Sequence, residues 1–172
     1  MFATIVLMDG MVGRDADSLA LPPAQDELLD DLSFLLARAN ALSLSAGNAA
    51  LSAHGLRVRS YSVLALAAGT ARPSQRELAE LLRLDPSQVV ALVDDLQSRG
   101  LVVREPDPTD RRANVVVATE QGRALRYLAS ASARAAEREL HDHLSAAERR
   151  VLADLLRRLA FPPRASARGV GA

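Results

Sequence analysis

The feature that most constrains the fold of this chain is a central segment in which two short helices precede two short strands. Ser74, with a glutamate three residues later, forms a capping box that predicts the start of a first helix. Asp85, followed by proline, predicts the start of a second helix. The Val-rich runs 101–105 and 114–118 predict two strands, because β-branched residues favour extended backbone. The polar loop 106–112 holds two prolines and is expected to join the strands as a hairpin.

Helices are expected to make up most of the remaining chain. Apolar residues recur there at spacings of three and four, the period of a helix with one buried face. The expected helices are 25–53, 59–68, one opening at Ser74, one from Asp85 to Ser98, 120–144, and one from Ser145 to Leu159. The predicted fold class is therefore mainly α with a small β-hairpin wing, a winged helix-turn-helix joined to a helical dimerisation region.

Four parts are expected along the chain. Residues 1–24 lack a steady period and are interpreted as a flexible N-terminal arm, and residues 161–172 as a disordered tail. Segments 25–56 and 120–160 are expected to form the helical dimerisation region, and 57–119 the winged helix-turn-helix DNA-binding lobe.

The two central helices have distinct inward and outward faces. The residues expected to be buried are Leu78, Leu81 and Leu82 in the first helix and Val89, Leu92, Val93 and Leu96 in the second. The outward residues near the N-terminus of the second helix are Ser87, Gln88, Val90 and Ala91. A helix with one buried face and a free N-terminus can enter a major groove, where Gln pairs with adenine and apolar side chains touch thymine methyl groups. The alternative is a buried bundle helix in which Val90 belongs to the core.

The loop between the strands carries the charged triplet Asp110, Arg111 and Arg112. Arginine at the tip of a stiff wing suits a narrow minor groove, where the electrostatic potential is most negative. The alternative is a solvated turn in which Asp110 pairs with one arginine. After a pair of capped helices, insertion of the wing into the groove is the favoured interpretation.

Taken together, residues 74–122 resemble the DNA-binding lobe of the MarR family of bacterial transcription regulators. Residues 88–104 resemble the recognition helix and first wing strand of that family, and 106–112 resemble its wing signature. Residues 119–122 resemble the threonine-to-glycine start of its long fifth helix. In helix order the resemblance covers about residues 26–160.

The resemblance implies a homodimer with intertwined outer helices, a pseudo-palindromic double-stranded DNA operator, and often a small anionic or aromatic ligand that releases the DNA. By position, Arg112 would enter the minor groove with Asp110 orienting it, and Arg104 would lie near phosphates. The full predicted DNA-binding set is Ser74, Gln75, Ser87, Gln88, Val90, Ala91, Arg104, Asp110, Arg111 and Arg112.

The charge of the lobe departs from that of a typical DNA-binding surface. Residues 72–112 hold seven arginines and eight carboxylates, which gives no basic footprint. Asp95 stands where the family often has a basic or neutral residue. This carboxylate weakens phosphate attraction if it faces DNA and is harmless if it faces Arg99, four residues on. Binding is expected to be salt-sensitive but modest.

The two ends of the chain have opposite charge. Residues 1–31 hold seven acidic residues against one arginine, and residues 145–172 hold six arginines against two acidic residues. The first and last helices are therefore expected to meet. The helices after 119 also carry more apolar surface than a winged helix needs, which favours a homodimer over a monomeric bundle.

A ligand site is expected near the first bend of the chain, where arginine and an aromatic neighbour could hold a carboxylate. The candidate residues are Asn48, His54, Arg57, Arg59 and Tyr61. The alternative for each is an ordinary surface or core role. His141 and His143 are two residues apart, so on a helix they cannot share one metal ion, and no metal site is predicted.

Composition excludes several function classes. The chain has no Cys, which removes disulfides, thiolate chemistry and a thiol-based peroxide sensor. No apolar run is long enough for a membrane span and no basic region precedes the apolar start, so a cytoplasmic protein is expected. No residue set supports an enzyme or a cofactor. The predicted function is a homodimeric DNA-binding repressor; the alternative is a winged-helix protein-interaction module without DNA binding.

Overall fold

The computed structural model describes residues 26–107, 110 and 113–162. The chain divides into two units, 1–38 and 39–172, and each is considered by itself. The elements are α1 (Asp26–Leu29), α2 (Leu32–Ser52), α3 (Val58–Ala67), α4 (Gln75–Leu82), α5 (Pro86–Ser98), β1 (Val102–Pro106), β2 (Asn114–Ala118), α6 (Glu120–Leu140) and α7 (Ala146–Ala160). The predicted fold class, mainly α with a β-hairpin wing, is confirmed.

The predicted helix 25–53 is wrong as a single element, because the structure breaks it between α1 and α2. Asp31 causes the break. Its side-chain oxygen accepts a hydrogen bond from the backbone N–H of Phe34 at 2.7 Å, as an N-capping residue does. The apolar period continues through this cap, so periodicity alone could not reveal it.

The predicted helix 120–144 is four residues too long, because α6 ends at Leu140. Residues 141–144 form a turn, and a side chain of the next helix donates hydrogen bonds to two of its backbone carbonyls. Arg149 donates to the carbonyl of His141 at 3.1 Å and also to that of Leu144. Ser145 then begins α7 through the capping box that the sequence predicts, with Glu148 as its partner.

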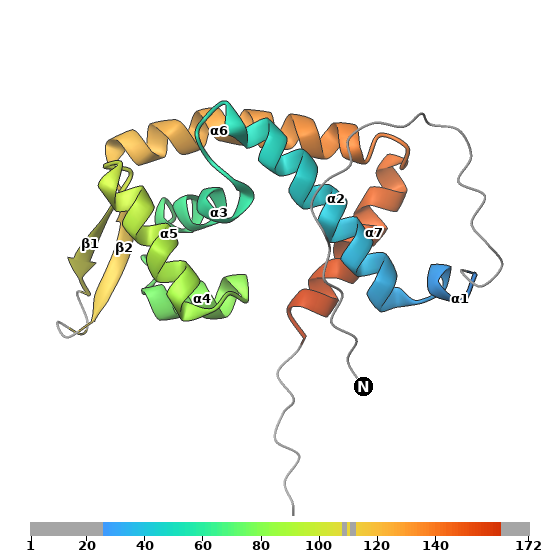
Figure 1. Cartoon of the computed structure of the whole chain (residues 1–172), viewed down its shortest axis with the longest axis horizontal. Helices are drawn as coiled ribbons and strands as arrows, with labels where there is room; N and C mark the ends of the chain where they lie inside the picture. Colours follow the sequence, from blue (N-terminus) through green and yellow to red (C-terminus); the bar gives the residue numbers. More distant parts are fainter. Residues whose placement is uncertain (1–25, 108–109, 111–112, 163–172) are drawn as a thin grey trace, which may run out of the picture. The chain divides into compact units, whose positions relative to one another are not determined.

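One hydrophobic core lies between α3, α4, α5 and the hairpin. Its fully buried side chains include Val63 and Leu64 of α3, Leu78 of α4, Val102 of β1 and Val116 of β2. From α5 it takes Val89, Val93 and Leu96, as predicted, with Leu92 partly buried beside them. In Figure 1, α5 lies beside α4, with the hairpin on its other side.

The prediction that Leu81 is buried is wrong, since its side chain is 48% exposed. α4 has only eight residues, and Leu78, Ala79 and the partly buried Leu82 fill the face that meets the core. Leu81 lies about 60° around the helix from Leu78, on the side away from Ala79 and Leu82, and so falls outside the face that meets the core.

The hairpin is antiparallel, and the segment before α4 extends it. Val102 pairs with Ala118, and Pro106 pairs with Asn114. The N–H of Val116 donates to the carbonyl of Pro73 at 2.8 Å, which adds a short third edge to the sheet. This contact fixes the start of α4 against the wing.

The outer helices leave many apolar side chains exposed. No residue of α7 is buried within the described part of the chain, although the helix carries four leucines. The exposed large apolar residues of α1, α2, α6 and α7 are Leu28, Leu29, Leu32, Leu35, Leu36, Leu42, Tyr127, Leu128, Val151, Leu152, Leu155, Leu156 and Leu159. None of the described helices is long and apolar enough to cross a membrane.

Candidate nucleic-acid interface and adjoining pocket

The N-terminus of α5 is organised by Asp85. Its carboxylate accepts the backbone N–H of Ser87 at 2.8 Å and the hydroxyl of Ser87 at 2.5 Å. These two hydrogen bonds lower the pKa of Asp85 below its ordinary value, so the cap stays charged. Because the Ser87 hydroxyl donates its proton to Asp85, its oxygen is left as an acceptor for an amino group on a base edge.

All four predicted base-reading residues of α5 are exposed. Ser87 and Ala91 lie opposite the buried face, while Val90 and Gln88 lie on its two flanks. Val90 adjoins a hollow shared with α4, which Arg76 and Arg83 also line. The structure therefore brings these residues together on one outward surface near a helix N-terminus, as entry into a major groove requires.

Three other predicted DNA contacts are held by partners within the chain. The backbone N–H and the hydroxyl of Ser74 both donate to Glu77 at 2.8 Å, and these two hydrogen bonds lower the pKa of Glu77. The side-chain oxygen of Gln75 accepts a hydrogen bond from Arg104 at 2.9 Å. Arg104 also donates to Gln97 and Asp94.

The described part of the wing consists of the two strands, the base of the loop between them, and Asp110. The backbone N–H of Asp107 donates to the carbonyl of Ala113 at 2.9 Å, which closes the loop, and Asp110 lies inside it. Arg111 and Arg112, the predicted minor-groove residues, lie outside the described residues.

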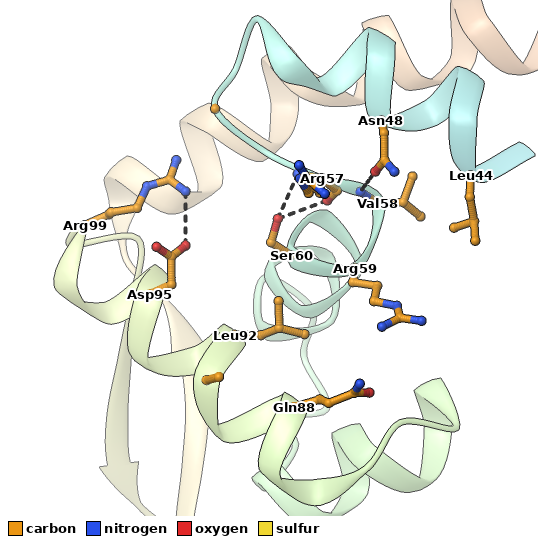
Figure 2. Close-up of a pocket in the computed structure, with 12 residues that line it drawn as sticks. Leu44, Asn48, Arg57, Val58, Arg59, Ser60, Gln88, Leu92, Asp95 and Arg99 are labelled. Carbon is orange, nitrogen blue, oxygen red and sulfur yellow. Dashed lines mark hydrogen bonds and ion pairs between the residues drawn. The ribbon is translucent and has the colours of Figure 1, made fainter. Parts of the chain in front are cut away.

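A pocket of about 740 Å³ lies between α2, α3 and the flank of α5. Three arginines and one carboxylate line it, so its charge is positive. In Figure 2, the side chains of Arg59 from α3 and Gln88 from α5 extend into the same open space. The lining residues are Leu44, Asn48, Gly55, Arg57, Val58, Arg59, Ser60, Gln88, Ala91, Leu92, Asp95 and Arg99.

Two contacts between lining residues stabilise the walls of this pocket. The Asn48 side-chain oxygen accepts the backbone N–H of Val58 at 2.9 Å, which joins α2 to the first residue of α3. Across the pocket, Asp95 forms an ion pair with Arg99 at 3.2 Å (Figure 2). The carboxylate that could oppose DNA binding therefore faces Arg99, the harmless arrangement considered from the sequence.

Of the five predicted ligand residues, three line the pocket and two have other contacts. Asn48, Arg57 and Arg59 line the pocket. His54 instead shares a hydrogen bond with Ser132 of α6 at 2.9 Å, and Tyr61 packs against the core. The sequence prediction missed Arg99 as a pocket residue, since α5 approaches α2 and α3 only in the folded chain.

Comparison with known proteins supports the resemblance. A model of the MarR family matches residues 54–113. A protein of Thauera aromatica, named as a transcriptional regulatory protein for the hcr operon, is 37% identical over 58% of this chain. That alignment spans 60% of the relative's length.

Solved structures match over a larger part of the chain. A MarR-family transcriptional regulator of Rhodococcus sp. RHA1 is 46% identical, with a TM-score of 0.73 over 79% of this chain and 98% of its own. CouR of Rhodococcus jostii RHA1, bound to p-coumaroyl-CoA, is also 46% identical, with a TM-score of 0.71 over 79% and 96%. A CouR repressor bound to a 23-mer DNA duplex is 29% identical, with a TM-score of 0.72 over 79% and 96%. With the capped helix pair, the hairpin and near-complete coverage of a 46% identical regulator, the chain belongs to the MarR family.

Proposed function

We propose that the chain is a homodimeric, sequence-specific DNA-binding repressor that an anionic aromatic ligand releases from its operator. The observation that carries this proposal is the N-terminal half of α5. It buries Val89 and Val93 in the core and exposes Ser87, Gln88 and Ala91 on the outside. Such a helix can read base edges in a major groove while the hairpin lies against the neighbouring minor groove.

The acidic residues of the lobe do not prevent this role, because most are held by partners in the chain. Arg72, Arg76, Arg99 and Arg104 each form an ion pair with a carboxylate. Glu77 and Asp85 serve as helix caps. Phosphate attraction then rests on Arg83 and the wing arginines, because the first N–H groups of α5 are bonded to Asp85. The affinity is therefore expected to be modest and sensitive to salt.

A second copy of the chain is the partner that the outer helices support. Leu155 and Leu159 of α7 are 48% and 65% exposed. The exposed leucines of α2 are Leu32, Leu35, Leu36 and Leu42. A contiguous apolar surface of this kind on a helix marks an interface. The acidic first 31 residues and the basic residues after 144 give the two ends complementary charge. Residues 25–56 and 120–160 would form this dimerisation region.

The pocket beside α5 supports release by an anionic ligand. Arg57, Arg59 and Arg99 can bind carboxylate or phosphate groups, and Leu44 and Leu92 offer apolar surface for a ring. Gln88 and Ala91 belong both to this lining and to the predicted base-reading set. A ligand in the pocket would therefore contact the recognition helix directly. The 46% identical CouR binds p-coumaroyl-CoA, which makes aromatic acyl-CoA thioesters the first ligands to test.

The proposed regulator acts in the cytoplasm and carries out no enzymatic reaction. Fluorescence anisotropy tests its DNA binding at physiological salt, with duplex from upstream of the protein's own gene and a shuffled duplex of equal composition. The proposal predicts tight binding to the native duplex alone and its reversal by p-coumaroyl-CoA. Weak, equal binding to both duplexes would support the protein-interaction module instead.

A further inference from the structure

Arg104 joins the wing to both helices of the helix-turn-helix. It lies on β1 and donates a hydrogen bond from each of its three nitrogen atoms to a different side chain. Nε donates to Gln75 of α4 at 2.9 Å, Nη1 to Gln97 of α5 at 2.7 Å, and Nη2 to Asp94 of α5 at 2.6 Å. These partners are 29, 7 and 10 residues away in sequence.

The planar guanidinium makes this contact geometrically demanding. Its N–H donors lie in a fixed fork, so three acceptors are satisfied together only when β1, α4 and α5 keep one arrangement. The Arg104 side chain is 23% exposed, which leaves little of it to solvent. The sequence alone predicted that Arg104 lies near phosphates, and a guanidinium engaged in this way is poorly placed for that role.

We propose that Arg104 and Asp94 form a positioning clamp, which fixes the recognition helix relative to the wing in the geometry that fits DNA. The clamp rests on the proposed function, since it positions the DNA-reading residues. Asp94 is then required for DNA binding although its carboxylate is on the outward side of α5.

The clamp and a phosphate contact predict opposite results for Asp94→Asn. If Arg104 binds phosphate, loss of the Asp94 carboxylate removes a nearby negative charge and frees Arg104, so affinity for DNA rises. If the clamp operates, the variant loses the charged acceptor at 2.6 Å and the two DNA-reading elements become less well aligned. Operator affinity then falls, by roughly five- to tenfold.

Arg104→Lys separates positioning from charge. Lysine keeps the positive charge but cannot offer three donors in a planar fork. The clamp predicts that Arg104→Lys weakens binding as much as Asp94→Asn does, with the slope of log affinity against log salt unchanged. A phosphate contact predicts nearly normal binding for Arg104→Lys, and for Arg104→Ala a slope smaller by about one.

The experiment measures operator Kd by anisotropy for the full-length wild type, Asp94→Asn, Arg104→Lys and Glu105→Gln. Glu105→Gln is the matched control, because it also removes an arginine-paired carboxylate from the lobe, but its partner Arg72 does not link β1 to α4 or α5. We expect this control to bind within twofold of wild type. Binding by Asp94→Asn as tight as or tighter than wild type would overturn the clamp, as would wild-type affinity for Arg104→Lys.

Hydrogen exchange supplies a readout that needs no DNA. The clamp predicts faster exchange of the backbone amides of β1 in Asp94→Asn and unchanged exchange in the core helix α3. Unchanged β1 exchange would count against the clamp even if the chain bound no duplex at all. Failure of the wild type to bind DNA would instead contradict the proposed function, so the two failures are distinguishable. Gln97→Ala, which removes one clamp contact and no charge, should show the same exchange change to a smaller degree.

Discussion

Replacement of Gly122 by alanine should destabilise the fold, although the same change in a helix is ordinarily favourable. Alanine is better than glycine inside a helix by about 1 kcal/mol. At this site, however, an added Cβ would lie 2.0 Å from the carbonyl oxygen of Leu101 and 3.2 Å from a methyl group of Leu64. The carbonyl belongs to the backbone between α5 and β1, so it cannot move aside as the end of a side chain can.

The contact is close because α6 begins directly against that turn. Thr119, the capping residue, donates its hydroxyl to the carbonyl of Gly100 at 2.7 Å and accepts the N–H of Gly122 at 3.0 Å. Overpacking of a well-packed site costs about 1–3 kcal/mol, and a backbone clash belongs at the upper end. Once the helical gain of about 1 kcal/mol is subtracted, we expect a net loss of about 2 kcal/mol. This loss corresponds to a fall in Tm of roughly 4–8 °C for a chain of this length.

Thermal unfolding followed by circular dichroism measures the effect, at one fixed protomer concentration because dimerisation adds to stability. Gly47→Ala is the matched control, since Gly47 is also helical and its added Cβ would meet a methyl group of Val58 at 2.6 Å. A side chain can adjust more easily than backbone, so this control should lose less stability than Gly122→Ala. A Gly122→Ala protein as stable as wild type, or a larger loss for Gly47→Ala, would show that the Leu101 carbonyl does not exclude a Cβ at this site.

Three further predictions concern acid stability, assembly and the wing. Hydrogen bonds from Ser74 and Ser145 lower the pKa values of Glu77 and Glu148 below 4.5, so the two ionised carboxylates stabilise the fold fully above that pH and lose this effect as the pH falls through the lowered values. The double variant Glu77→Gln, Glu148→Gln should therefore show a flatter decline of Tm than wild type between about pH 6 and pH 3. A decline as steep as that of wild type would contradict this. Leu155→Arg should shift the chain from dimer to monomer in size-exclusion chromatography with light scattering, because it places charge in the exposed apolar face of α7; a dimer of wild-type stability would show that α7 lies outside the interface. Arg112→Ala should weaken operator binding strongly while the dimer persists, and wild-type affinity in an anisotropy titration would remove the wing from the interface.

The central lobe could be predicted from the sequence because its signals are local. The capping box at Ser74 and the cap at Asp85 each depend on residues two or three positions apart, and the structure contains both. The Val-rich strands are also found within one residue of their predicted bounds. Asp31 is a local signal of the same kind, but the apolar period on both sides of it favoured one continuous helix.

The contacts that connect distant residues could not be predicted in the same way. The three partners of Arg104 lie on two other elements, and no sequence pattern specifies which side chains a guanidinium will meet. The pocket likewise combines Asn48 of α2 with Arg99 beyond the end of α5. The cluster that is local in sequence predicts the pocket in part. Asn48, Arg57 and Arg59 line it, whereas the backbone turns His54 and Tyr61 toward α6 and the core.

Hydroxyl-radical footprinting of the native operator tests whether two copies of α5 read DNA in successive major grooves. We expect two symmetric protected half-sites on one face of the duplex, with centres about one helical turn apart. We also expect p-coumaroyl-CoA to remove both together. One protected site, or protection spread evenly along the duplex, would show that the chain does not bind DNA as a symmetric pair of recognition helices.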